Sequence, residues 1–151
     1  MRLSATDPLG LAVAFVLCAL RRWSLLSGWA AALAGTGVLN TTLKGVVRRL
    51  RPQLPEPWVT ESGWSFPSGH AMGSFVTYGF GLPAHPHDPT YFPRWTAIAV
   101  LAGLVLLIGF SRIYLGVHFL SDVIGGYAAA AVWLTFCILF THRMQGRTHV
   151  S

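Results

Sequence analysis

The 151-residue chain is poor in charged side chains, and poorest in acids. Asp, Glu, Lys and Arg make up 11% of its residues, and five acids stand against eleven cations. Soluble domains carry about 25% charged residues, because charged side chains keep the protein surface solvated. With 53% hydrophobic residues and a mean hydropathy of +0.53, the composition excludes an ordinary soluble domain and a disordered chain. It predicts one integral membrane domain over residues 1–151.

Cysteine and lysine are also scarce. The only two cysteines, Cys18 and Cys137, lie inside apolar segments without metal-type spacing, and we interpret them as small buried hydrophobes. Ten of the eleven cations are arginines, and Lys44 is the single lysine. The cations are scattered between apolar segments and do not form one stripe, which disfavours a nucleic-acid partner.

Five apolar segments predict an all-α, polytopic bundle of about five membrane helices, since lipid admits only helices or closed barrels. A barrel is disfavoured because the segments are continuously apolar and do not alternate. The first is short for a span, which needs about 20 residues. A proline-rich loop, 44–67, and a second turn, 83–89, separate the middle segments. The five segments are residues 9–20, 23–43, 70–82, 95–110 and 119–140.

The number of segments places loop 44–67 and the turn 111–118 on the same side of the membrane. That side collects most of the unusual polar residues of the chain. Ionisable residues at a membrane boundary that face the bundle interior are functional candidates. The residues gathered there are Lys44, Arg51, Ser68, His70, Arg112, His118 and Asp122.

Lys44 and Arg51 are seven residues apart, which predicts that both lie on one helical face before Pro52 ends the helix. Two cations on one face indicate an anion clamp. Ordinary snorkelling to lipid phosphates is the alternative for this pair. It is also our interpretation of Arg48 and Arg49.

A second cluster opens the segment that begins near His70. Ser68 is a good N-cap, and Gly69 allows a ligand to approach the backbone. The exposed N–H groups of a helix start bind anions, and His70 in the first turn would face such an anion. The alternatives are a plain helix cap and a structural histidine.

His118 and Asp122 are spaced i, i+4, so they can touch on one helical face. The carboxylate would then fix the imidazole tautomer and leave the other ring nitrogen free as a nucleophile. A structural hydrogen bond is one alternative. A metal site is the other, and it is disfavoured because further Cys, Glu or His ligands are missing nearby. We expect neither a metal nor a cofactor.

Together, Lys44-x6-Arg51-Pro52, Pro67-Ser68-Gly69-His70 and Ser111-Arg112-x5-His118-x3-Asp122 resemble the three signature motifs of the type 2 phosphatidic acid phosphatase (PAP2) superfamily. The resemblance covers residues 10–140. It implies metal-independent hydrolysis of a phosphomonoester or pyrophosphate through a phosphohistidine. In that scheme His118 is the nucleophile, Asp122 orients it, and His70 protonates the leaving oxygen and later helps to activate water. The phosphoryl oxygens would be held by Lys44, Arg51, Arg112, Ser68 and the Gly69 N–H.

The resemblance also implies a lipid phosphate as substrate, with membrane lipids around it. Phosphatidate, phosphatidylglycerophosphate and undecaprenyl pyrophosphate fit equally. Membrane members of the family usually have six helices, so we expect either a minimal member or a further N-terminal helix. Without the arginines expected to bind phosphate, three arginines remain on the side of the membrane that carries the motifs, and five lie on the opposite side. The positive-inside rule then predicts that the opposite side is cytoplasmic and the site extracytoplasmic. The resemblance implies a bacterial inner membrane.

Two other functions are compatible with these motifs. A vanadate-dependent haloperoxidase would share them, but the known ones are soluble and the five apolar segments disfavour it. A non-catalytic protein that binds lipid phosphates is disfavoured by the intact set of His70, His118 and Asp122.

Overall fold

The computed structural model describes residues 8–53, 59–80 and 93–147, and the regular structure within them is entirely helical. This confirms the predicted all-α class. The helices are α1 (Pro8–Ala19), α2 (Trp23–Val47), α3 (Gly69–Gly79), α4 (Pro93–Tyr114) and α5 (Leu120–Arg147). The predicted turn at 83–89 lies outside the described residues.

Two of these helices have the length and composition of a membrane span. They contain the apolar segments Trp95–Tyr114 and Leu120–Phe140, of 20 and 21 residues. At a rise of about 1.5 Å per residue, each reaches about 30 Å, the thickness of the hydrocarbon core. The 12 residues of α1 and the 11 of α3 are too few to do so alone. Cys18 of α1 is exposed, so the prediction that it is buried was wrong: it lies on an uncovered side of that helix.

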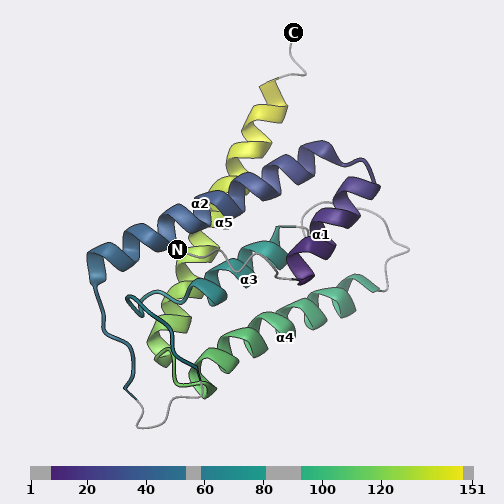
Figure 1. Ribbon diagram of the computed structural model, residues 1–151. Helices are drawn as coiled ribbons and strands as arrows, with labels where there is room; N and C mark the ends of the chain where they lie inside the picture. Colours follow the sequence, from purple (N-terminus) through teal and green to yellow (C-terminus); the bar gives the residue numbers. More distant parts are fainter. Residues whose placement is uncertain (1–7, 54–58, 81–92, 148–151) are drawn as a thin grey trace.

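Helix α3 lies in the middle of the bundle and packs against α2, α4 and α5 (Figure 1). Its Met72 and Val76 form the centre of the core with Ala32 of α2 and Ala130 of α5. The two alanines are almost completely buried, at 1% and 0% exposure. Small residues of this kind allow helices in a membrane to approach closely, where packing rather than water exclusion holds them together. The short third helix is therefore fixed from three sides.

Four helix ends meet at one end of the bundle: the last turns of α2 and α4 and the first turns of α3 and α5 (Figure 1). Backbone hydrogen bonds join the segments. Ser65 donates its N–H to Arg49 O at 2.8 Å, and Ser68 donates to Asp122 O at 3.0 Å. The described parts of loop 44–67 and the turn 111–118 lie together at this end, where Arg51 Nη1 donates to Val117 O. Their common side of the membrane stays a prediction.

The last turn of α2 differs from the sequence prediction. The helix ends at Val47, because Arg48 adopts a left-handed conformation (φ 47°) and donates its N–H to Lys44 O. Arg51 therefore follows the helix in irregular chain, and the prediction that it shares a helical face with Lys44 was wrong. The change of direction at Arg48 brings the next three residues across the end of the bundle.

Gly126 allows α5 to approach the first turn of α3. A Cβ added there would lie 2.9 Å from the Ser68 carbonyl oxygen, a backbone atom that cannot rotate away. We therefore expect Gly126→Ala to lower the free energy of unfolding by about 1–3 kcal/mol. Gly103→Ala is the matched control, since nothing lies within 4 Å of its added Cβ, and it should stabilise its helix by roughly 0.5–1 kcal/mol. Thermal unfolding in one detergent compares the two, and equal midpoints would contradict this packing.

Candidate active site

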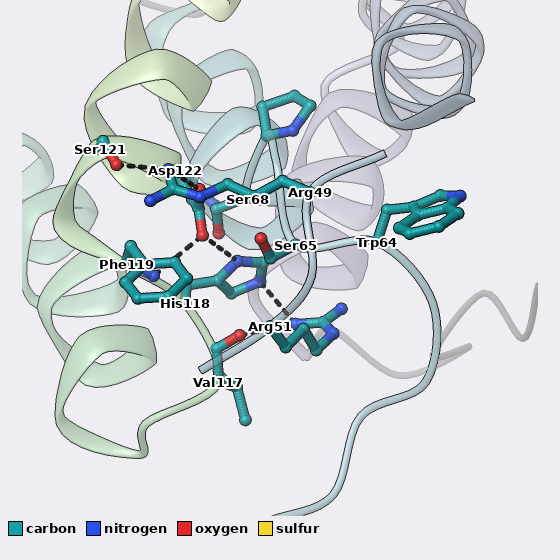
Figure 2. Close-up of polar contacts among 12 residues, drawn as sticks. Arg49, Arg51, Trp64, Ser65, Ser68, Val117, His118, Phe119, Ser121 and Asp122 are labelled. Atoms are coloured by element: carbon teal, nitrogen blue, oxygen red, sulfur yellow. Dashed lines mark hydrogen bonds and ion pairs between the residues drawn. The ribbon is translucent and has the colours of Figure 1, made fainter. Parts of the chain in front are cut away.

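His118 and Asp122 are brought together where α4 turns into α5. Gly116 adopts a positive φ of 68°, and the N–H groups of Val117 and His118 both donate to Arg112 O. This tight turn places His118 two residues before α5 and Asp122 in its first turn. The Asp122 carboxylate is fully buried, accepts a hydrogen bond from the Phe119 N–H at 2.9 Å, and lies 3.5 Å from His118 Nδ1 (Figure 2). The predicted His–Asp pair is thus present, but the prediction of a shared helical face was wrong, because His118 lies in the turn before α5.

The contacts of His118 assign its tautomer. Arg51 Nη1 lies 3.2 Å from His118 Nε2, and a guanidinium can only donate. Nε2 is therefore the acceptor, and the ring proton is on Nδ1, the nitrogen that faces Asp122. At 3.5 Å this second contact is longer than a hydrogen bond, and Nδ1 has no other hydrogen-bond partner among the described residues. The Nε2 lone pair is therefore directed at Arg51.

The imidazole of His118 is neutral at physiological pH. Burial is the main cause that lowers its pKa from 6.5 to about 4, and the positive charges of Arg51 and Lys44 lower it further. Glu61 and Asp122 oppose these effects without cancelling them. A neutral imidazole with one unprotonated ring nitrogen is the form that can act as a nucleophile.

Arg49 belongs to the site, although the sequence indicated only snorkelling. Its Nη1 forms an ion pair with Asp122 Oδ1 at 3.0 Å and donates to Ser121 Oγ at 2.6 Å. Its guanidinium also lies 4.2 Å from the centre of the Phe119 ring (Figure 2). No motif marks Arg49, because its direction depends on the left-handed residue before it. Arg48, in contrast, donates to Gly45 O of its own helix and stays exposed.

Arg51 and Arg112 come from two segments and meet at the Glu61 carboxylate beside His118 Nε2, and we call these two arginines the cationic cluster. Arg51 also donates to Val117 O at 2.8 Å, which fixes its guanidinium at the turn. Arg112 lies at the end of α4 and donates Nε to Ser111 Oγ. Within the described chain the cluster holds one carboxylate, that of Glu61, at 3.0 Å from Arg51 Nη2 and 3.8 Å from Arg112 Nη1. Sequence reasoning assigned no role to Glu61.

The remaining predicted residues frame this cluster. Lys44 Nζ donates to the backbone oxygens of Trp64 and Ser65, which holds the loop between α2 and α3. Ser68 is the predicted N-cap: it is fully buried, and its Oγ accepts from Ala71 N. Gly69 begins α3, where an added Cβ would lie 3.3 Å from Asn40 Oδ1. His70 follows, with an exposed side chain.

The described residues contain no group of three or more His, Cys, Asp or Glu side chains that could hold a metal ion. The donors beside His118 are instead mainly cationic, and cations repel a metal and attract an anion. The expectation of a metal-free reaction remains a prediction.

An apolar bundle with two helices long enough to span a bilayer, and with a buried His–Asp pair and arginines at one end, has the architecture of a membrane protein. The sequence model of the PAP2 superfamily matches residues 23–145. The chain belongs to that superfamily, as its three motifs indicated. It is 40% identical to phosphatidylglycerophosphatase B of Bacillus subtilis (strain 168) over 93 residues. These residues cover 60% of this chain and 45% of the relative.

A second curated relative is undecaprenyl-diphosphatase of Sulfolobus acidocaldarius. It is 34% identical over 106 residues, which cover 66% of this chain and 46% of the relative. The chain thus spans about half the length of these two relatives.

Solved structures confirm the membrane helix bundle. The crystal structure of a transmembrane PAP2-type phosphatidylglycerolphosphate phosphatase from Bacillus subtilis matches with a TM-score of 0.75 and 28% identity, over 90% of this chain and 68% of that one. Aquifex aeolicus LpxE has the same fold, with a TM-score of 0.68 and 24% identity over 88% of this chain and 78% of its own.

Proposed function

We propose that this chain hydrolyses lipid phosphates without a metal, through a phosphohistidine formed on His118. One observation carries the proposal: the unprotonated Nε2 of His118 accepts from Arg51, while Nδ1 faces Asp122. The family membership and the phosphatase names of two relatives support the same reaction.

In the first step, Nε2 attacks phosphorus and the bond from phosphorus to the leaving oxygen breaks. The leaving oxygen takes a proton from His70, while Asp122 stabilises the positive charge that develops on the His118 ring. In the second step, water attacks the phosphohistidine, gives a proton back to His70, and the N–P bond breaks. Inorganic phosphate leaves, and both histidines return to their starting states.

Charge stabilisation is the main demand of phosphoryl transfer. Arg51 donates to Nε2, Arg112 reaches the same Glu61 carboxylate as Arg51, and Lys44 adds a third positive charge near His118. The beginning of α3, with the Ser68 cap and the Gly69 N–H, adds the positive end of a helix dipole. These groups would hold the phosphoryl oxygens.

The direct test is phosphate release in detergent micelles containing excess EDTA. The panel compares phosphatidate, phosphatidylglycerophosphate and undecaprenyl pyrophosphate, since the relatives act on two different kinds of lipid phosphate. We expect turnover of at least one of them with EDTA present. Loss of all turnover on chelation, or halide oxidation with added vanadate in place of hydrolysis, would contradict the proposal.

We further propose that the site faces the extracytoplasmic side of a bacterial inner membrane. With Arg49 assigned to the site, five of the seven remaining arginines belong to the segments of the opposite side. A cysteine-free variant with one new cysteine tests this. Ser62→Cys, in the loop beside the site, should react with an impermeant maleimide on intact cells, and Arg22→Cys at the α1–α2 turn should not. The reverse pattern would invert the orientation.

Arg48 and Arg49 form a matched pair for testing the site. Arg49→Ala removes the ion pair to buried Asp122, whereas Arg48→Ala removes only a bond within its own helix end. We expect kcat to fall by roughly 10- to 100-fold in the first variant and by less than about 2-fold in the second. Steady-state kinetics on one lipid phosphate compares them, and equal effects would remove Arg49 from the site.

The low pKa of His118 has a kinetic signature. The substrate dianion is lost below about pH 6, the second pKa of a phosphate ester, so kcat/KM should fall about tenfold per pH unit there. Because His118 stays neutral down to about pH 4, the fall should steepen to about 100-fold per unit only below that value. A profile from about pH 3.5 to 8 measures this. If log(kcat/KM) instead changed by two per pH unit from pH 6 downward, the pKa of His118 would be that of an ordinary histidine.

A further inference from the structure

The carboxylate of Glu61 lies where the proposed reaction needs the phosphoryl group. Oε2 is 3.0 Å from Arg51 Nη2 and 3.9 Å from His118 Nε2, and Oε1 is 3.8 Å from Arg112 Nη1. One carboxylate therefore contacts both arginines of the cationic cluster and lies beside His118 Nε2. Its two oxygens mark positions that two phosphoryl oxygens would take.

Glu61 and a substrate cannot bind the cluster together. A nucleophile attacks from about 3–3.5 Å, and an oxygen 3.9 Å from Nε2 fills the space that phosphorus and its oxygens need. The carboxylate must leave before the reaction begins. Its side chain is 25% exposed and belongs to a loop, so rotation into solvent suffices.

The loop keeps Glu61 close after it leaves. Lys44 holds the oxygens of Trp64 and Ser65, Ser65 donates to Arg49 O, and Arg51 Nε donates to Gly63 O at 3.2 Å. A tethered group returns at a high effective concentration, in the millimolar range or above. The Glu61 carboxylate and any external anion thus compete continuously for the cationic cluster.

We propose that Glu61 is a built-in competitor that determines the affinity of the site for anions; this inference rests on the proposed function. Competition raises every apparent dissociation constant by the same factor. A substrate whose tail is anchored in the bilayer still binds at this weaker affinity, because the membrane keeps it close to the site. Inorganic phosphate, the product, has no such anchor and dissociates. Glu61 would therefore limit product inhibition. Without it, the positive charges of Arg51, Arg112 and Lys44 would keep inorganic phosphate bound in the site.

The test compares wild type with Glu61→Gln, with Ser62→Ala as an exposed control in the same loop. Titration calorimetry of the detergent-solubilised protein gives Kd for inorganic phosphate and for tungstate, and kinetics gives KM and kcat. In Glu61→Gln we expect both Kd values and KM to fall by a common factor of about ten, with kcat within about twofold. Ser62→Ala should match wild type.

Glu61→Asp provides a second variant, since its shorter side chain cannot reach all three partners and should give an intermediate factor. Unchanged Kd values, or a lower kcat at constant KM, would overturn the inference and make Glu61 a structural residue. The calorimetry needs no turnover. Tighter phosphate binding in a protein without activity would support the inference while refuting the proposed hydrolysis, and normal activity with unchanged binding would refute the inference alone.

Discussion

Replacing His118 by alanine should lower kcat on every lipid phosphate by at least ~10²-fold, because the variant lacks the atom that forms the N–P bond. His118 is 3% exposed, and the contact of Nε2 with Arg51 fixes which ring nitrogen is unprotonated. The measurement is phosphate release in micelles. Activity above one third of wild type would show that another group attacks phosphorus.

His70→Ala separates the two histidine roles. A general acid matters most when the leaving group is a poor one, so we expect a loss of at least ~10²-fold on a long-chain alkyl phosphate and a much smaller loss on 4-nitrophenyl phosphate. His118→Ala should lose both activities equally. If His70→Ala also loses both, His70 is not the acid and the roles must be reassigned.

Asp122→Asn should lower kcat by ~10²–10⁴-fold while the protein stays folded. The carboxylate faces the Nδ1–H of His118 and pairs with Arg49. An amide of the same shape cannot stabilise the imidazolium charge, and its NH2 group can favour the wrong tautomer, as in the serine protease triad. Ser121→Ala is the control: it removes one acceptor of Arg49 and should cost only a few-fold.

Two measurements distinguish loss of chemistry from loss of structure in Asp122→Asn. Its unfolding midpoint in detergent should remain within a few degrees of wild type. Its Kd for inorganic phosphate should change little, because Arg51 and Arg112 are untouched. A variant that keeps full kcat would show that the His–Asp contact is structural only.

The sequence predicted the fold and the His–Asp pair because both depend on local regularities. Continuous apolar segments imply helices in lipid, and a spacing of four keeps His118 close to Asp122 although His118 precedes the helix. Ser68 was recognised as a cap from its place before a helix. In each case the relevant neighbours lie within one or two turns along the chain.

Residues between the motifs could not be placed in this way. The direction of Arg49 and Arg51 depends on the left-handed turn at Arg48, which nothing in the spacing announces, since a non-glycine residue rarely adopts that conformation. Glu61 contacts residues ten and more positions away through an irregular loop. Both Arg49 and Glu61 were found only from their contacts with Asp122 and the cationic cluster.

The central claim is a covalent phosphohistidine on His118, and trapping it is the most direct test. The detergent-solubilised protein is mixed with a ³²P-labelled lipid phosphate, quenched in alkali within one turnover, and digested for peptide mapping. We predict a label that is stable in base and lost in acid, located at His118 and absent from His118→Ala. Turnover of the wild type without any trapped label, or a label on another residue, would contradict the account.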